Sequence, residues 1–304
     1  MRSWKLVVVV LVGGLLVGLN SVVLSRLLDL GSPPPARRSV EAPPDARPIV
    51  HVGVISRYAP SLTYDRYQPL MDYLSAHGSY RYELRLSATY EDAGVQLRRG
   101  DVIASFFGTW IYARMGPRMG LAPILAPRNE EGGTTFHAAL IVPARSRLSG
   151  ISDLAGRRVA MPSRSSYAGN WLAVEALPAV GLSFADLDSV HHFDYHQTVV
   201  HRVLDGEFDA GVVREAVARE FAGQGVRIIA RSGPFPGPPL VIREGNTHPA
   251  IAEIRRLLLG LDPRKLADTT QAAGWPREFE YGFVGVDAAT YEDIVRQLNA
   301  RGTP

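Results

Sequence analysis

The chain has 304 residues, 46% hydrophobic and 21% charged, which is typical of a globular protein of about two domains and excludes a coiled coil, a collagen and general disorder. Cysteine is absent, which excludes disulfide scaffolds, thiolate metal sites, iron–sulfur clusters and cysteine nucleophiles. The formal charge of +3 is small against 33 basic and 30 acidic side chains, and no basic block occurs, so nucleic acid is not an expected partner.

Residues 1–30 are predicted to be a transmembrane anchor or a signal segment. Arg2 and Lys5 precede Leu6–Leu24, a run without a charged residue, and a helix of about 20 apolar residues crosses a bilayer. The length favours an anchor with an inside N-terminus, while Asn20 and Ser21 leave a cleaved signal peptide open. Both alternatives place the body in the periplasm or otherwise outside the cytoplasm.

The next segment, residues 31–48, is rich in proline. Proline favours extended polyproline II and cannot build a hydrophobic core, so this segment is predicted to be a semi-rigid spacer.

Strands and helices then alternate. Hydrophobic patterning predicts strands over 49–55, 82–86 and 102–107, and helices over 67–74 and 90–99. In the first helix the apolar residues fall on one face, and Pro69 is expected in its first turn. Gly100 is expected to end the second helix, because glycine relieves the left-handed conformation at helix C-termini.

A second unit repeats this plan. Strands are predicted over 137–142, 158–161, 190–193 and 208–213, a helical turn over 151–154, and helices over 170–177 and 197–204. Leu97–Val102 resembles Val203–Phe208, which indicates two similar lobes. A strand over 240–243 and helices over 249–261 and 291–301 would return to the first lobe. The pattern predicts an α/β fold whose mostly parallel sheets are flanked by helices, with lobe 1 over 49–142, lobe 2 over 143–240 and a return over 241–304.

Five motifs in this order are similar to those of the phosphate, phosphite and phosphonate substrate-binding proteins of bacterial ABC transporters. They are Tyr67–Leu74, Gly100–Asp101 with Phe107–Tyr112, Ser149–Ala160, Ser165–Ser166, and His196 followed by Val203–Gly211. The resemblance covers residues 49–301. It implies a periplasmic-binding-protein type II fold with a two-stranded hinge near Ile141–Pro143 and Pro239–Arg243, which closes on an oxyanion.

The loop of Ser163, Arg164, Ser165, Ser166 and Tyr167 is the first candidate for ligand binding. It lies between a predicted strand and a predicted helix, where unpaired N–H groups converge on an anion. Alternatively, one of its serines caps the helix. The resemblance implies a hydroxyl cluster that grips the oxyanion here. Arg164 and Tyr167 depart from the family pattern, and Arg164 would either bind the oxyanion with two hydrogen bonds or face the solvent.

The resemblance also assigns roles to His196 and Asp209. It implies that His196 donates a hydrogen bond to the ligand and that Asp209 accepts a proton or an amine from it. The alternatives are a histidine that only packs at the start of a helix, and an acid at a strand end that binds the nearby backbone.

On the first lobe, Tyr58, Trp110 and Tyr112 are the candidates. They follow predicted strands, and ligands of open α/β sheets bind at the carboxyl ends of strands. We expect them to cover the ligand and exclude water, with packing in the core as the alternative.

No metal, cofactor or catalytic residue is expected. His191, His192, His196 and His201 do not have the spacing of a zinc motif, and the common nucleophile motifs are absent. We therefore expect an extracytoplasmic solute-binding protein that captures a small oxyanion by hinge closure for a membrane permease. The alternatives are a tethered sensory subunit of a histidine kinase and an enzyme on the same scaffold.

Overall fold

The computed structural model describes residues 46–55, 58–261, 275 and 279–300. The expected membrane segment at 1–30 and nearly all of the spacer lie outside these residues. Within the described ranges, no helix combines the length and hydrophobicity needed to cross a bilayer. From Arg47 onward the chain forms one compact unit, and this unit contains two main sheets.

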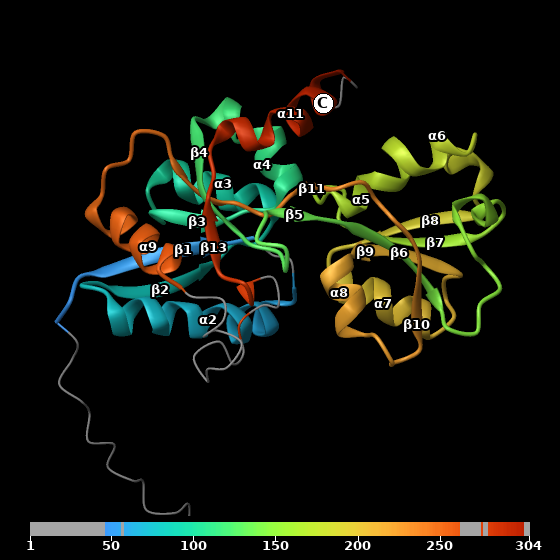
Figure 1. Cartoon of the computed structure of the whole chain (residues 1–304), viewed down its shortest axis with the longest axis horizontal. Helices are drawn as coiled ribbons and strands as arrows, with labels where there is room; N and C mark the ends of the chain where they lie inside the picture. The colour runs from blue at the N-terminus through green and yellow to red at the C-terminus, as the bar shows by residue number, and fades with distance from the viewer. Residues whose placement is uncertain (1–45, 56–57, 262–274, 276–278, 301–304) are drawn as a thin grey trace, which may run out of the picture. The chain divides into compact units, whose positions relative to one another are not determined.

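The first sheet has the order β13-β4-β12-β3-β1-β2 (Figure 1). Its strands are β1 (Ile49–Val54), β2 (Arg81–Leu86), β3 (Ala104–Phe106), β4 (Leu121–Pro127), β12 (Leu240–Arg243) and β13 (Phe283–Gly285). The sheet is covered by α2 (Pro60–His77), α3 (Tyr90–Arg99), α4 (Thr109–Met115) and α9 (Pro249–Leu259), and α11 (Glu292–Ala300) packs on α4. Residues of α2 and α9 share a buried cluster with β1, while α3 and α4 share another with the sheet. Helices therefore cover both faces.

The second sheet has the order β10-β6-β9-β7-β8. Its strands are β6 (Ala138–Pro143), β7 (Arg158–Pro162), β8 (Ser189–Phe193), β9 (Ala210–Arg214) and β10 (Val226–Arg231). The helices beside it are α5 (Ala168–Trp171), a π-helical turn (Leu172–Ala176), α6 (Leu177–Ala179), α7 (His196–Leu204) and α8 (Glu215–Glu220). This sheet is the core of the second lobe, and the two-lobed α/β fold is confirmed.

Most strands of each sheet point the same way, as expected for parallel βαβ units. β1 pairs in parallel with β2 and β3, and β7 pairs in parallel with β8 and β9. The exceptions among the described strands are β12 and β13 in the first sheet and β6 in the second, which run against their neighbours.

The lobes are joined by the connections from β4 to β6 and from β10 to β12. On these connections β5 (Thr135–Phe136) and β11 (Phe235–Pro236) form a two-stranded antiparallel sheet. The expected hinge positions were therefore wrong. Residues 141–143 lie in β6, whose buried apolar run is held between β9 and β10, and residues 240–243 lie in β12 of the first sheet. The second lobe begins at residue 138 rather than at 143.

The helix predictions differ in accuracy. The helix α3 spans Tyr90–Arg99 and ends at Gly100, whose φ of 80° is left-handed, as predicted. The helix α2 begins at Pro60, well before the predicted residue 67, so Pro69 lies in its interior instead of its first turn. A proline at the first helical position favours this earlier start.

Candidate ligand-binding site

A small cavity of about 30 Å³ lies where the two lobes meet the hinge. This volume holds only a few water molecules and is far below the roughly 300–1,000 Å³ of typical ligand pockets. The first lobe contributes the ends of β1 and β3 and the starts of α3 and α4, and the second lobe contributes the starts of α5 and α7 and the end of β9. The lining residues are Ile55, Tyr90, Gly108, Thr109, Ser166, Tyr167, Ala168, His196, Arg214, Phe235 and Pro238.

Two residues of the predicted serine loop line this cavity. Ser166 is buried, and its Oγ donates to the carbonyl of Ser163 at 2.8 Å and accepts from the Gly169 N–H at 3.0 Å, so it caps the start of α5. A Cβ at Gly169 would lie 2.1 Å from the Ser163 oxygen. Glycine is therefore what allows α5 to sit this close to the loop.

The other loop residues point elsewhere. The Ser165 Oγ donates to Glu91 of the first lobe at 2.7 Å, and the Ser163 Oγ accepts from the Ser165 N–H at 3.2 Å. Arg164 is exposed and lines neither this cavity nor the larger one beside it. Of its two predicted orientations, the structure shows the one toward the solvent.

Tyr167 packs against residues of the hinge and of the first lobe. Its ring stacks on Phe235 of the hinge, with centroids 4.0 Å apart, and meets Trp110 of the first lobe edge-on at 5.9 Å. Its hydroxyl donates to Glu175 at 3.2 Å. Trp110 is thus an aromatic wall behind Tyr167 and is absent from the cavity lining itself.

His196 is almost fully buried at the start of α7, with 1% of its surface exposed. Its Nδ1 accepts a hydrogen bond from the Arg214 backbone N–H at 3.2 Å. Because Nδ1 is an acceptor, the neutral imidazole carries its proton on Nε2. The Nε2–H of His196 is therefore a hydrogen-bond donor, the kind of group that binds anions.

Three predicted site residues lie away from the cavity. Tyr58 is buried in the first lobe, where the Arg66 guanidinium lies 4.5 Å from its ring centroid. Tyr112 packs against Tyr291 in the core, and burial raises the pKa of its hydroxyl to about 12. Both tyrosines belong to buried clusters of the first lobe.

Asp209 is the third, and its predicted place was wrong. It precedes β9, at the opposite end of the strand from the cavity. It accepts hydrogen bonds from the Arg158 backbone at 2.9 Å and from the Arg158 guanidinium at 2.9 Å. These hydrogen bonds lower the pKa of the Asp209 carboxyl.

Arg214 was missed by the sequence analysis. It ends β9 at the carboxyl end of the strand, is 8% exposed, and lines the small cavity. Its guanidinium carbon lies 5.0 Å from the ring centroid of Phe136, within the range of a cation–π contact. The rule that ligands bind at the carboxyl ends of strands would have identified it, had it been applied to β9 as it was to β1 and β3.

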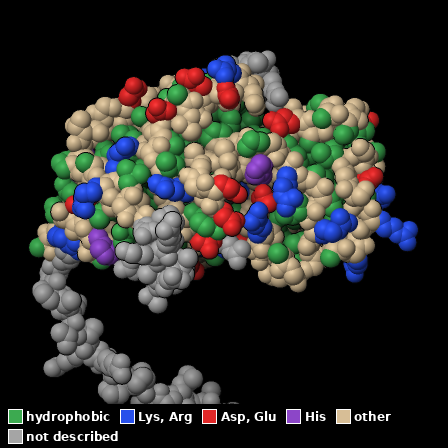
Figure 2. Space-filling view, in the orientation of Figure 1, with side chains coloured by type: hydrophobic (Ala, Val, Ile, Leu, Met, Phe, Trp, Pro, Cys, Tyr) green, Lys and Arg blue, Asp and Glu red, His purple; other side chains and the backbone are tan. Residues whose placement is uncertain are grey.

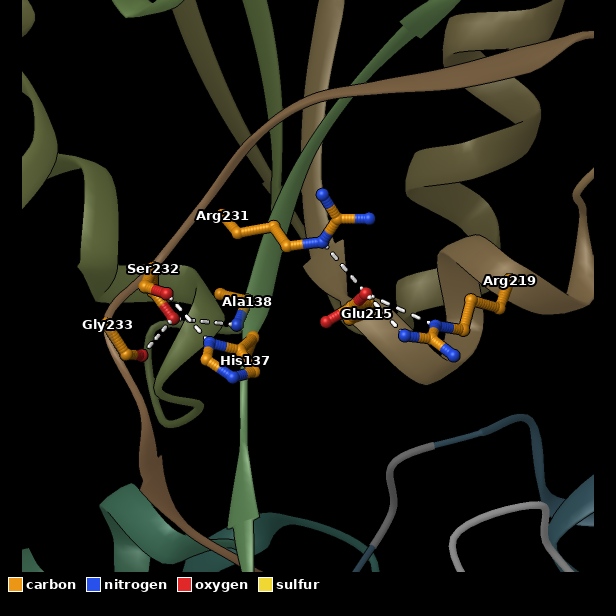
Figure 3. A network of polar contacts seen from close by, with 7 residues as sticks. All are labelled: His137, Ala138, Glu215, Arg219, Arg231, Ser232 and Gly233. Carbon is orange, nitrogen blue, oxygen red and sulfur yellow. Dashed lines mark hydrogen bonds and ion pairs between the residues drawn. The ribbon is translucent and has the colours of Figure 1, made fainter. Parts of the chain in front are cut away.

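A second cavity, of about 800 Å³, also includes Arg214 in its lining. Figure 2 shows acidic, basic and histidine side chains interleaved near the middle of one face. Charged side chains of both signs line this large cavity: Arg128, Glu130, Glu131, Arg214, Glu215, Arg219, Arg231 and Glu280. In Figure 3, Glu215 lies between two of these arginines and accepts from the Nε of Arg231 at 2.9 Å and from Arg219 at 3.0 Å.

His137, at the edge of the same network, contacts a different element (Figure 3). Its Nδ1 donates to the carbonyl of Ser232 at 2.8 Å, and the Ser232 Oγ accepts from the Ala138 N–H at 2.9 Å. These bonds tie the start of β6 to the segment that follows β10, next to the hinge.

An ion pair joins the lobes as well. Arg66 of α2 donates to both carboxylate oxygens of Glu220 at the end of α8, at 2.9 and 2.8 Å. Both side chains are mostly buried, with 19% and 14% exposed. Together with the bond from Ser165 to Glu91, this pair holds the lobes in contact.

The described residues contain no group of three or more metal-binding side chains. The histidines that might suggest a metal site in the sequence have other contacts. His192 donates from Nδ1 to the Pro162 carbonyl at 2.8 Å, and His201 meets Phe221 edge-on.

Two α/β lobes, a two-stranded connection and a cavity lined from both sides define the class of two-lobed solute-binding proteins. The family model described as "ABC transporter, phosphonate, periplasmic substrate-binding protein" matches residues 52–292. The chain belongs to this family. It is thus a substrate-binding protein of ABC transport, whose place is outside the cytoplasm and whose partners are a small ligand and a membrane permease.

Solved structures share the fold at low sequence identity. A binding protein component of an ABC phosphonate transporter from Pseudomonas aeruginosa has a TM-score of 0.69 at 14% identity, covering 83% of this chain and 85% of that one. PhnD1 from Prochlorococcus marinus, in complex with methylphosphonate, has a TM-score of 0.69 at 17% identity, covering 83% and 98%. XAC2383 from Xanthomonas citri, bound to ATP, has a TM-score of 0.59 at 21% identity, covering 83% and 97%.

Proposed function

We propose that the chain captures a small oxyanion of the phosphate, phosphite or phosphonate class in the small cavity and delivers it to the permease without changing it chemically. One observation carries the proposal: the cavity is lined from both lobes, and its lining includes His196 and Arg214, whose side chains are of the kind that bind oxyanions. A ligand gripped from both sides stabilises closure of the lobes. The methylphosphonate complex of PhnD1, which has the same fold, supports this ligand class.

The small volume of the cavity defines a step in binding. At about 30 Å³ it is far smaller than typical ligand pockets. We therefore infer that the lobes part, or that Tyr167 moves away from Phe235, when the ligand enters.

Titration calorimetry of the full-length chain with phosphate, phosphite, methylphosphonate and sulfate tests the proposal. We expect at least one phosphorus oxyanion to bind. His196→Asn keeps an acceptor near the Nδ1 position but removes the Nε2–H, and should weaken binding at least tenfold. His196→Gln keeps an amide N–H near Nε2 and should weaken it less.

His201→Ala, on the exposed side of the same helix, is the matched control and should bind like the wild type. A lack of heat with every phosphorus compound would contradict the proposal. Phosphorus NMR of the bound and released ligand should show the unchanged compound, and any product would contradict the absence of chemistry.

We also propose that residues 6–24 anchor the protein in the cytoplasmic membrane. The run lacks charged residues and follows Arg2 and Lys5, which favours retention with an inside N-terminus. N-terminal sequencing of the mature protein from membranes tests this, and a mature chain that begins after residue 24 would contradict it.

A further inference from the structure

Tyr167 is part of the wall of the small cavity, and 7% of its surface is exposed. One face of its ring stacks on Phe235 of β11, and the ring meets Trp110 of α4 edge-on. Protein interiors are close-packed, so a ring held in this way does not yield space without moving. The position of the Tyr167 ring therefore limits the room beside it for a ligand.

The hydroxyl of Tyr167 is bound by a residue outside the cavity. It donates to the carboxylate of Glu175, with Oε1 at 3.2 Å and Oε2 at 3.3 Å. Glu175 is half-buried and is not part of the lining of either cavity. A tyrosine ring that is attached at its Cβ and at its hydroxyl can rotate about its long axis. It cannot swing sideways to another rotamer without breaking the hydrogen bond.

A π-helical turn brings Glu175 to the side of the helix on which Tyr167 lies. The turn spans Leu172–Ala176, and the Leu177 N–H donates to the carbonyl of Leu172, five residues back. In a regular α-helix, a residue eight positions further on lies about 80° away around the axis, because successive residues are about 100° apart. A π turn inserts one residue, so Glu175 takes the place of a seventh residue, about 20° from Tyr167. The irregular turn thus aligns the two side chains.

We propose that Glu175 is a positioning residue that fixes the Tyr167 ring as the size limit of the small cavity, so that the site prefers oxyanions with small substituents. This inference rests on the function proposed above and narrows its ligand class by size. Glu175 and Tyr167 both belong to the second lobe, whereas Trp110 belongs to the first. When the lobes part, the ring stays with the second lobe, and a larger substituent cannot make room by swinging the ring alone.

The test compares methylphosphonate with propylphosphonate, which differ by two methylene groups, by calorimetry on the full-length chain. The wild type should bind methylphosphonate more tightly, because the fixed ring leaves little room for the longer chain. Tyr167→Phe keeps the ring and removes the hydroxyl, and it should reduce this preference about fivefold, on the scale of one hydrogen bond. Glu175→Ala should reduce it by a similar factor.

Three further variants separate a positioning role from a general effect on the helix. The double variant Tyr167→Phe with Glu175→Ala should behave like either single variant, because both changes break the same hydrogen bond. Glu175→Gln keeps an acceptor oxygen and should retain most of the wild-type preference. Val174→Ala truncates the neighbouring half-buried side chain of the same turn and is the matched control, which should retain the preference fully.

Thermal unfolding checks that the variants fold, and Tyr167→Phe tests the hydrogen bond even if Glu175→Ala does not fold. Three results would overturn the role of Glu175 and leave the proposed function standing: an unchanged preference in Tyr167→Phe, effects that add in the double variant, or a wild type that binds propylphosphonate at least as tightly as methylphosphonate. Binding of neither these two compounds nor phosphate or phosphite would instead overturn the proposed function.

Discussion

The two cavities beside the hinge are built from different chemistry. Among the described residues, the small one is lined mainly by aromatic, apolar and uncharged polar side chains with one arginine, whereas the large one is lined by several arginines and glutamates. A charge is felt more strongly where few polar groups and little water screen it. A site with fewer charges can therefore be the more selective one.

The largest effect should come from Tyr167, which closes the small cavity. Tyr167→Ala removes a buried ring that stacks on Phe235 and touches Trp110, so we expect a loss of about 3 kcal/mol in the free energy of unfolding. The emptied space should admit phenylphosphonate, which the wild type should exclude. Urea unfolding and calorimetry measure the two results.

Tyr64→Ala is the control, because Tyr64 is exposed on α2. If phenylphosphonate binds the wild type and the Tyr167 variant equally, Tyr167 does not limit the size of the small cavity.

The ion pair between Arg66 and Glu220 should have the next largest effect. Arg66→Gln leaves a mostly buried carboxylate without its cation, and we expect the closed arrangement to lose about 1–2 kcal/mol. Ligand affinity should fall about tenfold, and small-angle scattering should show a larger radius of gyration. Arg202→Gln, which breaks an exposed pair with Glu207 inside one lobe, should change neither. An unchanged radius would contradict a role in closure.

Asp209→Asn tests the end of β9 that faces away from both cavities. The variant weakens the contacts with Arg158, whose side chain is 42% exposed, so we expect a loss of about 1 kcal/mol in the free energy of unfolding. Ligand affinity should stay as in the wild type. A weaker affinity in a folded variant would show that Asp209 takes part in ligand binding.

The smallest effect should be the pH-dependent contribution of Glu215, in the large cavity, to the free energy of unfolding. Burial raises the pKa of this carboxyl, but the hydrogen bonds from Arg231 and Arg219 outweigh it, so the pKa is lowered overall. A lowered pKa in the folded state stabilises the protein above the unfolded value of about 4.3 and this contribution is lost as the pH falls through the folded value.

Glu215→Gln lacks this contribution. The difference in unfolding free energy between wild type and variant should therefore be greatest near neutral pH, at most about 1 kcal/mol because both arginines are half exposed. It should shrink below about pH 4. Urea unfolding from about pH 3 to 7 measures it, and a difference that grows toward low pH would contradict the prediction.

Much of the fold could be predicted from the sequence, because its signals are local. The apolar stripe of α2 and the glycine after α3 each reflect the geometry of one helix. The repeated plan of strands and helices then indicated two lobes. The hinge was misplaced because the apolar residue pattern of β6 is the same for a strand that connects two lobes and for a strand buried in a sheet. Only the pairing of β6 with β9 and β10 shows that it belongs to the second sheet.

The site was predicted less completely, because it depends on which end of a strand a residue occupies. Ser166 and Tyr167 were found from the place of their loop before a helix, and His196 was found from the resemblance. Asp209 and Arg214 are five positions apart, which in a strand is about 16 Å. The acid was chosen by resemblance. The arginine stands at the carboxyl end of β9, where the rule on strand ends points to a site residue, but the rule was not applied to this strand.

The pair of short strands β5 and β11 has a mechanical consequence. Phe136 of β5 lies under the Arg214 guanidinium, and Phe235 of β11 stacks on Tyr167. The connection between the lobes therefore borders both cavities, with Phe136 in the lining of the large one and Phe235 in that of the small one. A ligand that displaced Arg214 or Tyr167 would act directly on this connection.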